Sequence, residues 1–269
     1  MRYGALIRIK MIRQINESCD ELFSQLKHNH YSRRIKSHYQ AYGLGYDFAR
    51  FFEISDAGGA DVGAAAIFNA SMIVSTLEGR SFDNEALEEL SGFIKLNAPA
   101  VVEAEVCYSD ELKPLLADMY STDVRTQFEF QSRNALPIMD VNEIPKLDDV
   151  YKVLASSFPS IAESYELWIT DTSHRVRRGL SQSFLLGDYT TATIQYIVDK
   201  VALIGHVATT PERRGEFHAR KLLYWIGERL TLDGFTVRLF ARPHRVSYYE
   251  EIGFKELGTD IVFERIEED

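Results

Sequence analysis

A short polar turn between a strand and a helix could bind an anion. The apolar run VALIGHVATT ends in Pro211-Glu-Arg-Arg-Gly215, and an amphipathic helix follows directly. The first N–H groups of a helix have no partner inside the helix, and the helix dipole adds positive potential at that end. A strand, turn and helix in this order therefore predict a site for a phosphate or diphosphate group.

The residues around this turn are more basic than the rest of the chain. From Arg213 to Arg245 there are eight Arg and Lys against three Asp and Glu, a net charge of +5 in a chain whose total is −10. Some of these side chains are the ordinary charges of solvated helix and strand ends. The remainder would form a basic rim suited to a polyanionic small ligand.

Two motifs in this region resemble those of the GNAT superfamily of N-acetyltransferases. The family's loop has Gln or Arg, two variable residues, Gly, one variable residue, then Gly or Ala. The chain has Arg214-Gly-Glu-Phe217-His-Ala219, with Phe217 in the place of the middle glycine. Because glycine allows close backbone approach to a diphosphate, we expect Phe217 to adopt helical dihedrals with its ring turned toward the sheet.

The second motif lies downstream. The segment RPHRVSYYEEIGF resembles the family's Asn-Pro-x-Ala-x-x-Phe-Tyr-Glu-x-x-Gly-Phe, with Arg242 in place of Asn and Tyr248 in place of Phe. The family's Tyr-Glu and Gly-Phe pairs are both present, as Tyr249-Glu250 and Gly253-Phe254. This is the most extensive match in the chain.

The resemblance implies acetyl-CoA as co-substrate, bound where the fourth and fifth strands of the fold diverge. The backbone of 207–209 would pair with the pantetheine arm like an added strand, and the amides of 214–220 would hold the diphosphate. The implied cofactor-binding residues are Val207, Ala208, Thr209, Arg214, Gly215, Glu216, Phe217, His218, Ala219, Arg220 and Arg242.

The resemblance also implies acyl transfer to a primary amine by direct attack on the thioester. Tyr249 would be the general acid, since a phenol can protonate the departing thiolate. His206, two residues before Ala208 on the same strand, is a candidate general base because its ordinary pKa of about 6.5 suits it to accepting a proton. Glu212 is a second candidate, and an amine that arrives deprotonated needs no base. The base is left open.

Two other functions remain open at this point. Phe217 in the glycine position is compatible with a non-catalytic acyl-CoA-binding or regulatory module of the same fold, and a protein-interaction scaffold would need no nucleotide. The acceptor amine, small molecule or protein, is not specified by any motif. A homodimer is one of the oligomeric states that the sequence allows.

Composition excludes several classes. A net charge of −10 is a poor match to a nucleic-acid backbone. No run of eighteen apolar residues is present, and early Arg and Lys residues interrupt any signal-peptide core. We therefore expect a cytoplasmic protein with no membrane partner. The two cysteines, Cys19 and Cys107, lie far apart without a CxxC motif, so no metal site is expected.

The pattern of apolar residues predicts α/β architecture in two tandem GNAT-like domains. Each has a mixed, mostly antiparallel sheet flanked by helices, and the order of elements repeats. We place a degenerate N-terminal domain at 1–134, which lacks the diphosphate loop, and the acetyltransferase domain at 135–269. The first domain is predicted to have strands at 4–9, 47–54, 62–68, 71–76, 101–106 and 124–131 and helices at 11–28, 32–41, 84–97 and 110–119. The second is predicted to have helices at 147–158, 162–177, 216–232 and 245–252 and strands at 182–186, 190–198, 201–209, 236–240 and 261–265.

Overall fold

The structure, a computed structural model, describes residues 10–266. It divides into two compact units: unit 1 is the chain up to Val124 together with the segment from Asp260 onward, and unit 2 is Arg125–Thr259. The two units are defined by which residues contact one another, and they do not show which part of the chain folds independently. The domain boundary expected after residue 134 therefore stays a prediction. The strand expected at 4–9 lies outside the described residues.

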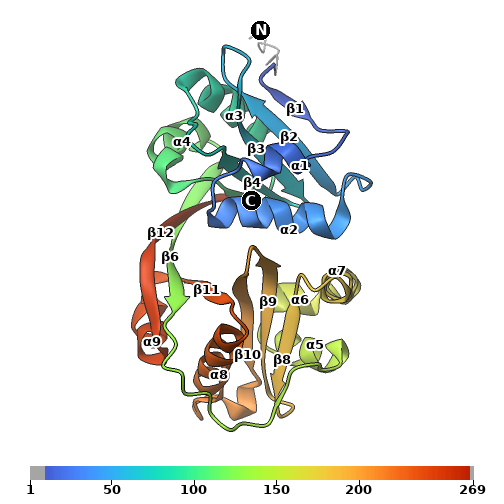
Figure 1. Cartoon of the computed structure of the whole chain (residues 1–269), viewed down its shortest axis with the longest axis vertical. Helices are drawn as coiled ribbons and strands as arrows, with labels where there is room; N and C mark the ends of the chain where they lie inside the picture. Colours follow the sequence, from blue (N-terminus) through green and yellow to red (C-terminus); the bar gives the residue numbers. More distant parts are fainter. Residues whose placement is uncertain (1–9, 267–269) are drawn as a thin grey trace. The chain divides into compact units, whose positions relative to one another are not determined.

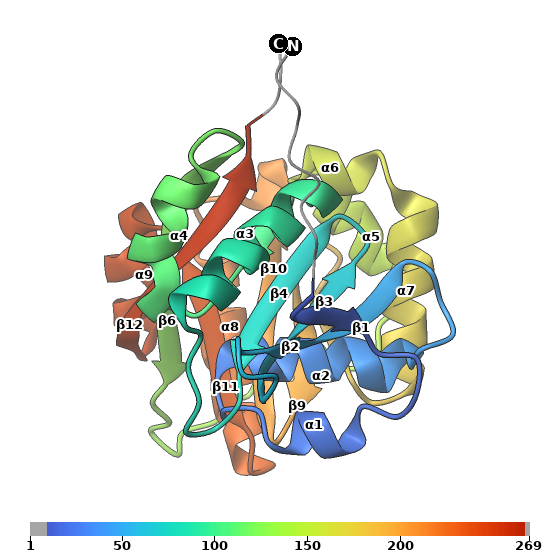
Figure 2. The ribbon, with the colours of Figure 1, turned by 90° about the horizontal axis from the view of Figure 1, so that it is seen from above.

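Unit 1 is a mixed sheet covered by helices on both faces (Figure 2). Its sheet order is β1-β2-β3-β4-β5-β12, antiparallel except for the pair β4 and β5. Its elements are β1 Ile12–Gln14, α1 Asp20–Ser24, α2 His30–Tyr42, β2 Ala49–Ser55, β3 Asp61–Phe68, β4 Ser71–Thr76, α3 Asn84–Asn97, β5 Val101–Glu103, the 3-10 turn η1 Val106–Tyr108 and α4 Ser109–Leu116. Two strands, β6 Tyr120–Phe130 and β12 Phe254–Arg265, have residues in both units.

The two faces of the unit 1 sheet follow from the alternation of strand side chains. Phe51 packs with α1 and α2, whereas its neighbour Phe52 packs with α3 and α4. α3 begins at Asn84, as predicted, and the side chain of Asp83 caps it by accepting a hydrogen bond from Ala86 N at 2.7 Å.

Unit 2 has the sheet order β6-β11-β10-β9-β8-β7, with β10 and β11 as its parallel pair. Figure 1 shows the strands from β6 to β8 in this order. Its remaining elements are β7 Val141–Asn142, α5 Leu147–Ala155, α6 Pro159–Ala162, α7 Tyr165–Arg177, β8 Gln182–Leu186, β9 Thr190–Val198, β10 Val201–Thr209, the 3-10 turn η2 Pro211–Arg213, α8 His218–Leu232, β11 Thr236–Ala241, the 3-10 turn η3 Pro243–Arg245 and α9 Val246–Ile252. Phe184 packs with α8 and α9, and the adjacent Leu185 packs with α5 and α6 on the opposite face.

The predicted fold class is confirmed, because each unit is a mostly antiparallel mixed sheet with helices on both faces. The helix predicted at 11–28 is wrong. Ile12–Gln14 instead pairs antiparallel with β2, and only Asp20–Ser24 is helical. The apolar residues of 11–28 are compatible both with one long helix and with a short strand followed by one helical turn. The second arrangement forms because the strand pairs with β2.

No helix among residues 10–266 is both long and apolar enough to cross a bilayer.

A buried glutamate in unit 2 fixes the segment that follows β6. Glu228 on α8 is fully buried, and its carboxylate accepts hydrogen bonds from Ser132 Oγ at 2.6 Å and Arg133 N at 2.7 Å. Burial by itself would raise the pKa of Glu228, but these bonds, with others from Tyr224 and the Ala135 backbone, lower the pKa below its usual range.

Glu228→Gln should therefore destabilise the protein in a pH-dependent way. At pH 7 we expect a loss of about 1–3 kcal/mol in the free energy of unfolding, because the NH₂ group of the glutamine would face N–H and O–H groups that also donate, and would leave a buried hydrogen bond unmade. Because the pKa of Glu228 is lower in the folded protein than in the unfolded chain, its ionised carboxylate stabilises the folded state at pH values above the unfolded-state pKa of about 4.3. This stabilisation is lost as the pH falls through the folded-state pKa. Urea unfolding should show the difference shrinking below pH 4. A difference of equal size at pH 7 and pH 3.5, or one matched by the exposed Glu256→Gln, would contradict this role.

Candidate functional site

The parallel strands β10 and β11 of unit 2 pair only at their beginnings. The aligned residues are Val201 with Thr236, Ala202 with Val237 and Leu203 with Arg238. Beyond this point β11 continues alongside β6 to Ala241, and β10 stays beside β9 to Thr209. The two strands therefore diverge, and the edge of β10 from Ile204 onward is not covered by β11.

β10 is irregular in the part that β11 does not pair with. Its register with β9 shifts between Leu203 and Val207, and His206 N donates to the Thr193 hydroxyl at 3.2 Å. Irregularities of this kind re-aim strand residues next to active sites. Since Thr210 N donates to Tyr189 O at 2.8 Å, the alternation of an extended chain turns the amides of Thr209 and Val207 away from β9 and toward the divergence.

The turn after β10 brings the start of α8 to the end of this edge. Gly215 and Phe217 both have positive φ, 86° and 60°, and α8 begins at His218 without a side-chain cap. The expectation that Phe217 has helical dihedrals with its ring against the sheet is wrong: its backbone is left-handed and the residue is 63% exposed. Phe217 thus adopts the backbone conformation that glycine adopts easily, and its ring lies outside the core.

Side-chain contacts hold this loop in place. Arg214 donates from Nε to Thr209 O at 3.1 Å and from Nη2 to Ser157 Oγ at 3.0 Å, which ties the turn to the end of β10 and to the second residue after α5. Glu216 contacts Arg213 at 3.3 Å and His218 at 2.9 Å. The side chain of Arg214 is therefore used within the protein. Its amide donates to Pro211 O at 3.3 Å, so the diphosphate contact expected from the Arg214 N–H is not available, and the free amides begin after it.

Two other predicted cofactor residues carry positive charge. Arg220, in the first turn of α8, pairs with Glu251, and its guanidinium lies 5.4 Å from the ring centroids of both Phe217 and Tyr248. Its buried Nε has no hydrogen-bond partner among the described residues. Arg242 is exposed and immediately precedes η3. Ala208 is buried and packs with α5, whereas Ala219 lies in the first turn of α8.

Tyr249 lies on α9 and packs on the same apolar cluster as Val207. Its ring contacts Phe128 and Phe254 at centroid distances of 5.9 and 6.0 Å. Burial raises the pKa of Tyr249, with a further rise from Tyr248, so the phenol remains protonated at neutral pH. A protonated phenol is the form that a general acid needs.

His206 is on the opposite side of β10 from Val207. Its ring lies 5.4 Å from the ring of Phe158, on the face that α5 covers. Burial lowers the pKa of His206, so its ring is neutral and able to accept a proton at physiological pH. Glu212, the other candidate base, is exposed in η2. In the described part of the chain no group of three or more His, Cys, Asp or Glu is placed to hold a metal ion.

Searches by sequence find no matching protein-family model and no matching curated protein. Solved structures do match. A GNAT-family acetyltransferase from Colwellia psychrerythraea is 15% identical with a TM-score of 0.56, covering 95% of this chain and 99% of that one. A tandem GNAT protein from the clavulanic acid biosynthesis pathway is 11% identical with a TM-score of 0.56, covering 96% and 99%. A GCN5-related N-acetyltransferase from Sphaerobacter thermophilus is 15% identical with a TM-score of 0.57, covering 93% and 90%.

The chain therefore has the fold of the GNAT N-acetyltransferases, as the two motifs predicted. More particularly, it shares the tandem form of that fold, since the match to the tandem protein extends over nearly the whole of both chains.

Proposed function

We propose that unit 2 is an N-acetyltransferase site that uses acetyl-CoA. One observation carries this proposal: the edge of β10 that β11 leaves uncovered leads through the eight residues 210–217 to the start of α8, which has no side-chain cap. The first feature suits the amides of the pantetheine arm and the second suits a diphosphate. The residues present fit the co-substrate. Phe217 has the left-handed backbone that a glycine at this position would adopt easily, and its exposed ring is not packed into the core.

In this proposal the backbone amides from Gly215 to Arg220 bind the diphosphate, and the amides of Val207 and Thr209 bind the arm. The Val207 N–H also donates to the thioester carbonyl oxygen, which stabilises the negative charge that develops there. Arg214 and Glu216 act indirectly, through the contacts that fix the loop. Arg220 and Arg242 contribute positive potential.

Acetyl-CoA supplies an activated acyl group. The neutral amine nitrogen attacks the carbonyl carbon, a C–N bond forms, and the C–S bond breaks. Tyr249 gives its proton to the departing thiolate, and the ammonium nitrogen loses a proton to His206 or to water. The phenolate is then reprotonated from solvent. The raised pKa keeps Tyr249 in its protonated form until the C–S bond breaks.

The test is acetyl-CoA-dependent release of free thiol across a panel of aliphatic amines, amino sugars, amino acids and peptides with free amino groups. Turnover with one class and N-acetylated product by mass spectrometry are expected. Absence of turnover across the panel with acetyl-CoA still bound would favour a non-catalytic acyl-CoA-binding module. Absence of binding, measured as no thermal stabilisation at high acetyl-CoA concentration, would contradict both.

A further inference from the structure

Unit 1 contains the same strand divergence as unit 2. Its parallel pair β4 and β5 aligns only Ser71 with Val101, Met72 with Val102 and Ile73 with Glu103. β4 continues beside β3 to Thr76, three residues beyond the last partner on β5. The alternation of β4 turns the backbone of Thr76 toward the uncovered side, because the next residue, Leu77, donates to Val62 O on the β3 side.

In unit 1 this edge is covered by the chain itself. Lys27 N donates to Thr76 O at 3.1 Å and Glu78 N donates to Gln25 O at 2.7 Å. Leu26 forms an antiparallel bridge with Leu77 between them. A three-residue segment therefore pairs with β4 in the way that an added strand, or an extended ligand with amide groups, would pair with it.

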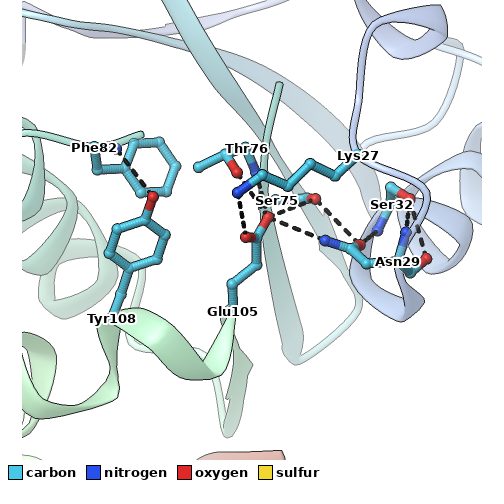
Figure 3. Close-up of polar contacts among 8 residues, drawn as sticks. All are labelled: Lys27, Asn29, Ser32, Ser75, Thr76, Phe82, Glu105 and Tyr108. Carbon is cyan, nitrogen blue, oxygen red and sulfur yellow. Dashed lines mark hydrogen bonds and ion pairs between the residues drawn. The ribbon is translucent and has the colours of Figure 1, made fainter. Parts of the chain in front are cut away.

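The remaining donor of this edge is bound by a buried glutamate. The Oε1 atom of Glu105 accepts hydrogen bonds from Thr76 N at 2.7 Å, Thr76 Oγ1 at 2.9 Å, and Ser75 Oγ and Asn29 Nδ2 both at 3.1 Å (Figure 3). Its Oε2 accepts from Lys27 Nζ at 3.0 Å. Glu105 is only 7% exposed. The converging donors and one ammonium make this a site for a carboxylate, which offers acceptors alone.

The approach to the following helix is also filled. Phe82 N, in the segment that precedes α3, donates to the Tyr108 hydroxyl at 3.2 Å (Figure 3). The start of α3 is capped by Asp83 through Ala86 N. In unit 2 the corresponding helix, α8, has no side-chain cap. Side chains of unit 1 thus accept hydrogen bonds from backbone N–H groups at the strand edge and near the start of the helix. The equivalent N–H groups of unit 2 are the ones we propose for a ligand.

We propose that unit 1 is a self-liganded copy of the site in unit 2. Gln25–Lys27 takes the position of an extended ligand, and the carboxylate of Glu105 is a built-in anion that neutralises the converging donors. The chain then carries one acyl-CoA site, and removing the Glu105 carboxylate leaves a vacancy specific for a small carboxylate. The comparison between the units rests on the function proposed for unit 2, but the test below involves unit 1 alone.

The experiment is chemical rescue of Glu105→Ala in the full-length chain. This substitution removes the atoms of an acetate ion and leaves the donors behind. We expect a melting temperature several degrees lower than that of the wild type, and a partial recovery with acetate at tens of millimolar that equimolar acetamide does not produce. Glu105→Gln should be destabilised as well, because its NH₂ group would face donors.

Leu112→Ala is the matched control, since Leu112 is fully buried in unit 1 and its removal leaves an apolar vacancy. Acetate and acetamide should act equally on it. If Glu105→Ala does not fold in plain buffer, refolding from urea with acetate or acetamide makes the same comparison. The proposal is overturned by wild-type stability of Glu105→Ala, or by equal effects of acetate and acetamide on that variant. Either result leaves the function of unit 2 untouched.

Discussion

Tyr249→Phe should lower kcat by about 10²-fold or more, the range in which positioned general acids contribute, while the Kd for acetyl-CoA stays within about twofold. The reason is that phenylalanine keeps the ring contacts with Phe128 and Phe254 and removes only the proton donor. Steady-state thiol release gives kcat, and calorimetric titration gives Kd.

Tyr248→Phe is the control for this prediction. Tyr248 is adjacent on α9, is also partly buried, and has a pKa raised by burial, but its ring faces the guanidinium of Arg220. We expect kcat of the control within about threefold of the wild type, as for a side chain that gives no proton to the thiolate. Equal kcat for Tyr249→Phe and the wild type would remove Tyr249 from the chemical step and leave the binding site standing.

Ala219→Asp should change stability and binding in opposite directions. Ala219 is the second residue of α8, where a carboxylate interacts favourably with the helix dipole and adds about 0.3–1 kcal/mol of stability. The same carboxylate would repel a bound diphosphate. We expect acetyl-CoA affinity to fall on the order of tenfold to hundredfold, because like charges about 5 Å apart repel by roughly 3 kcal/mol before screening.

The control is Ala219→Asn, which has the shape of aspartate without its charge. It should bind acetyl-CoA more tightly than Ala219→Asp, and raising the salt concentration should narrow the difference. Thermal melting without ligand and calorimetric titration with ligand measure the two effects separately. An Ala219→Asp variant that binds acetyl-CoA as tightly as the asparagine variant would show that the anion does not lie at the start of α8.

The sheet of unit 2 was predictable where the signal is local. The strands predicted at 182–186, 190–198 and 201–209 are confirmed at the same residues. Their apolar runs are long, and the turn at Asp199-Lys200 has positive φ at both residues, as expected of a two-residue hairpin turn. The last strand is longer than predicted, Phe254–Arg265 instead of 261–265, because its exposed and polar early part has no apolar pattern.

The site was predictable in part. The order of strand, turn and helix indicated where unbonded amides should lie, whereas the left-handed backbone of Phe217 had no signal, since a phenylalanine rarely adopts it. Glu105 was missed because its partners come from positions near 27 and 75, far away in the sequence. One signal was available: two glutamates, Glu103 and Glu105, lie within the strand predicted at 101–106, where an unpaired carboxylate would be costly.

The most direct test of the account is amide hydrogen exchange with and without coenzyme A. We predict slower exchange on binding at Val207 and Thr209 on β10 and in the first turn of α8, with no change at Thr76 and Phe82 in unit 1. Protection at Thr76 and Phe82 instead, or coenzyme A binding that leaves β10 and α8 unchanged, would contradict the proposal that unit 2 holds the acyl donor.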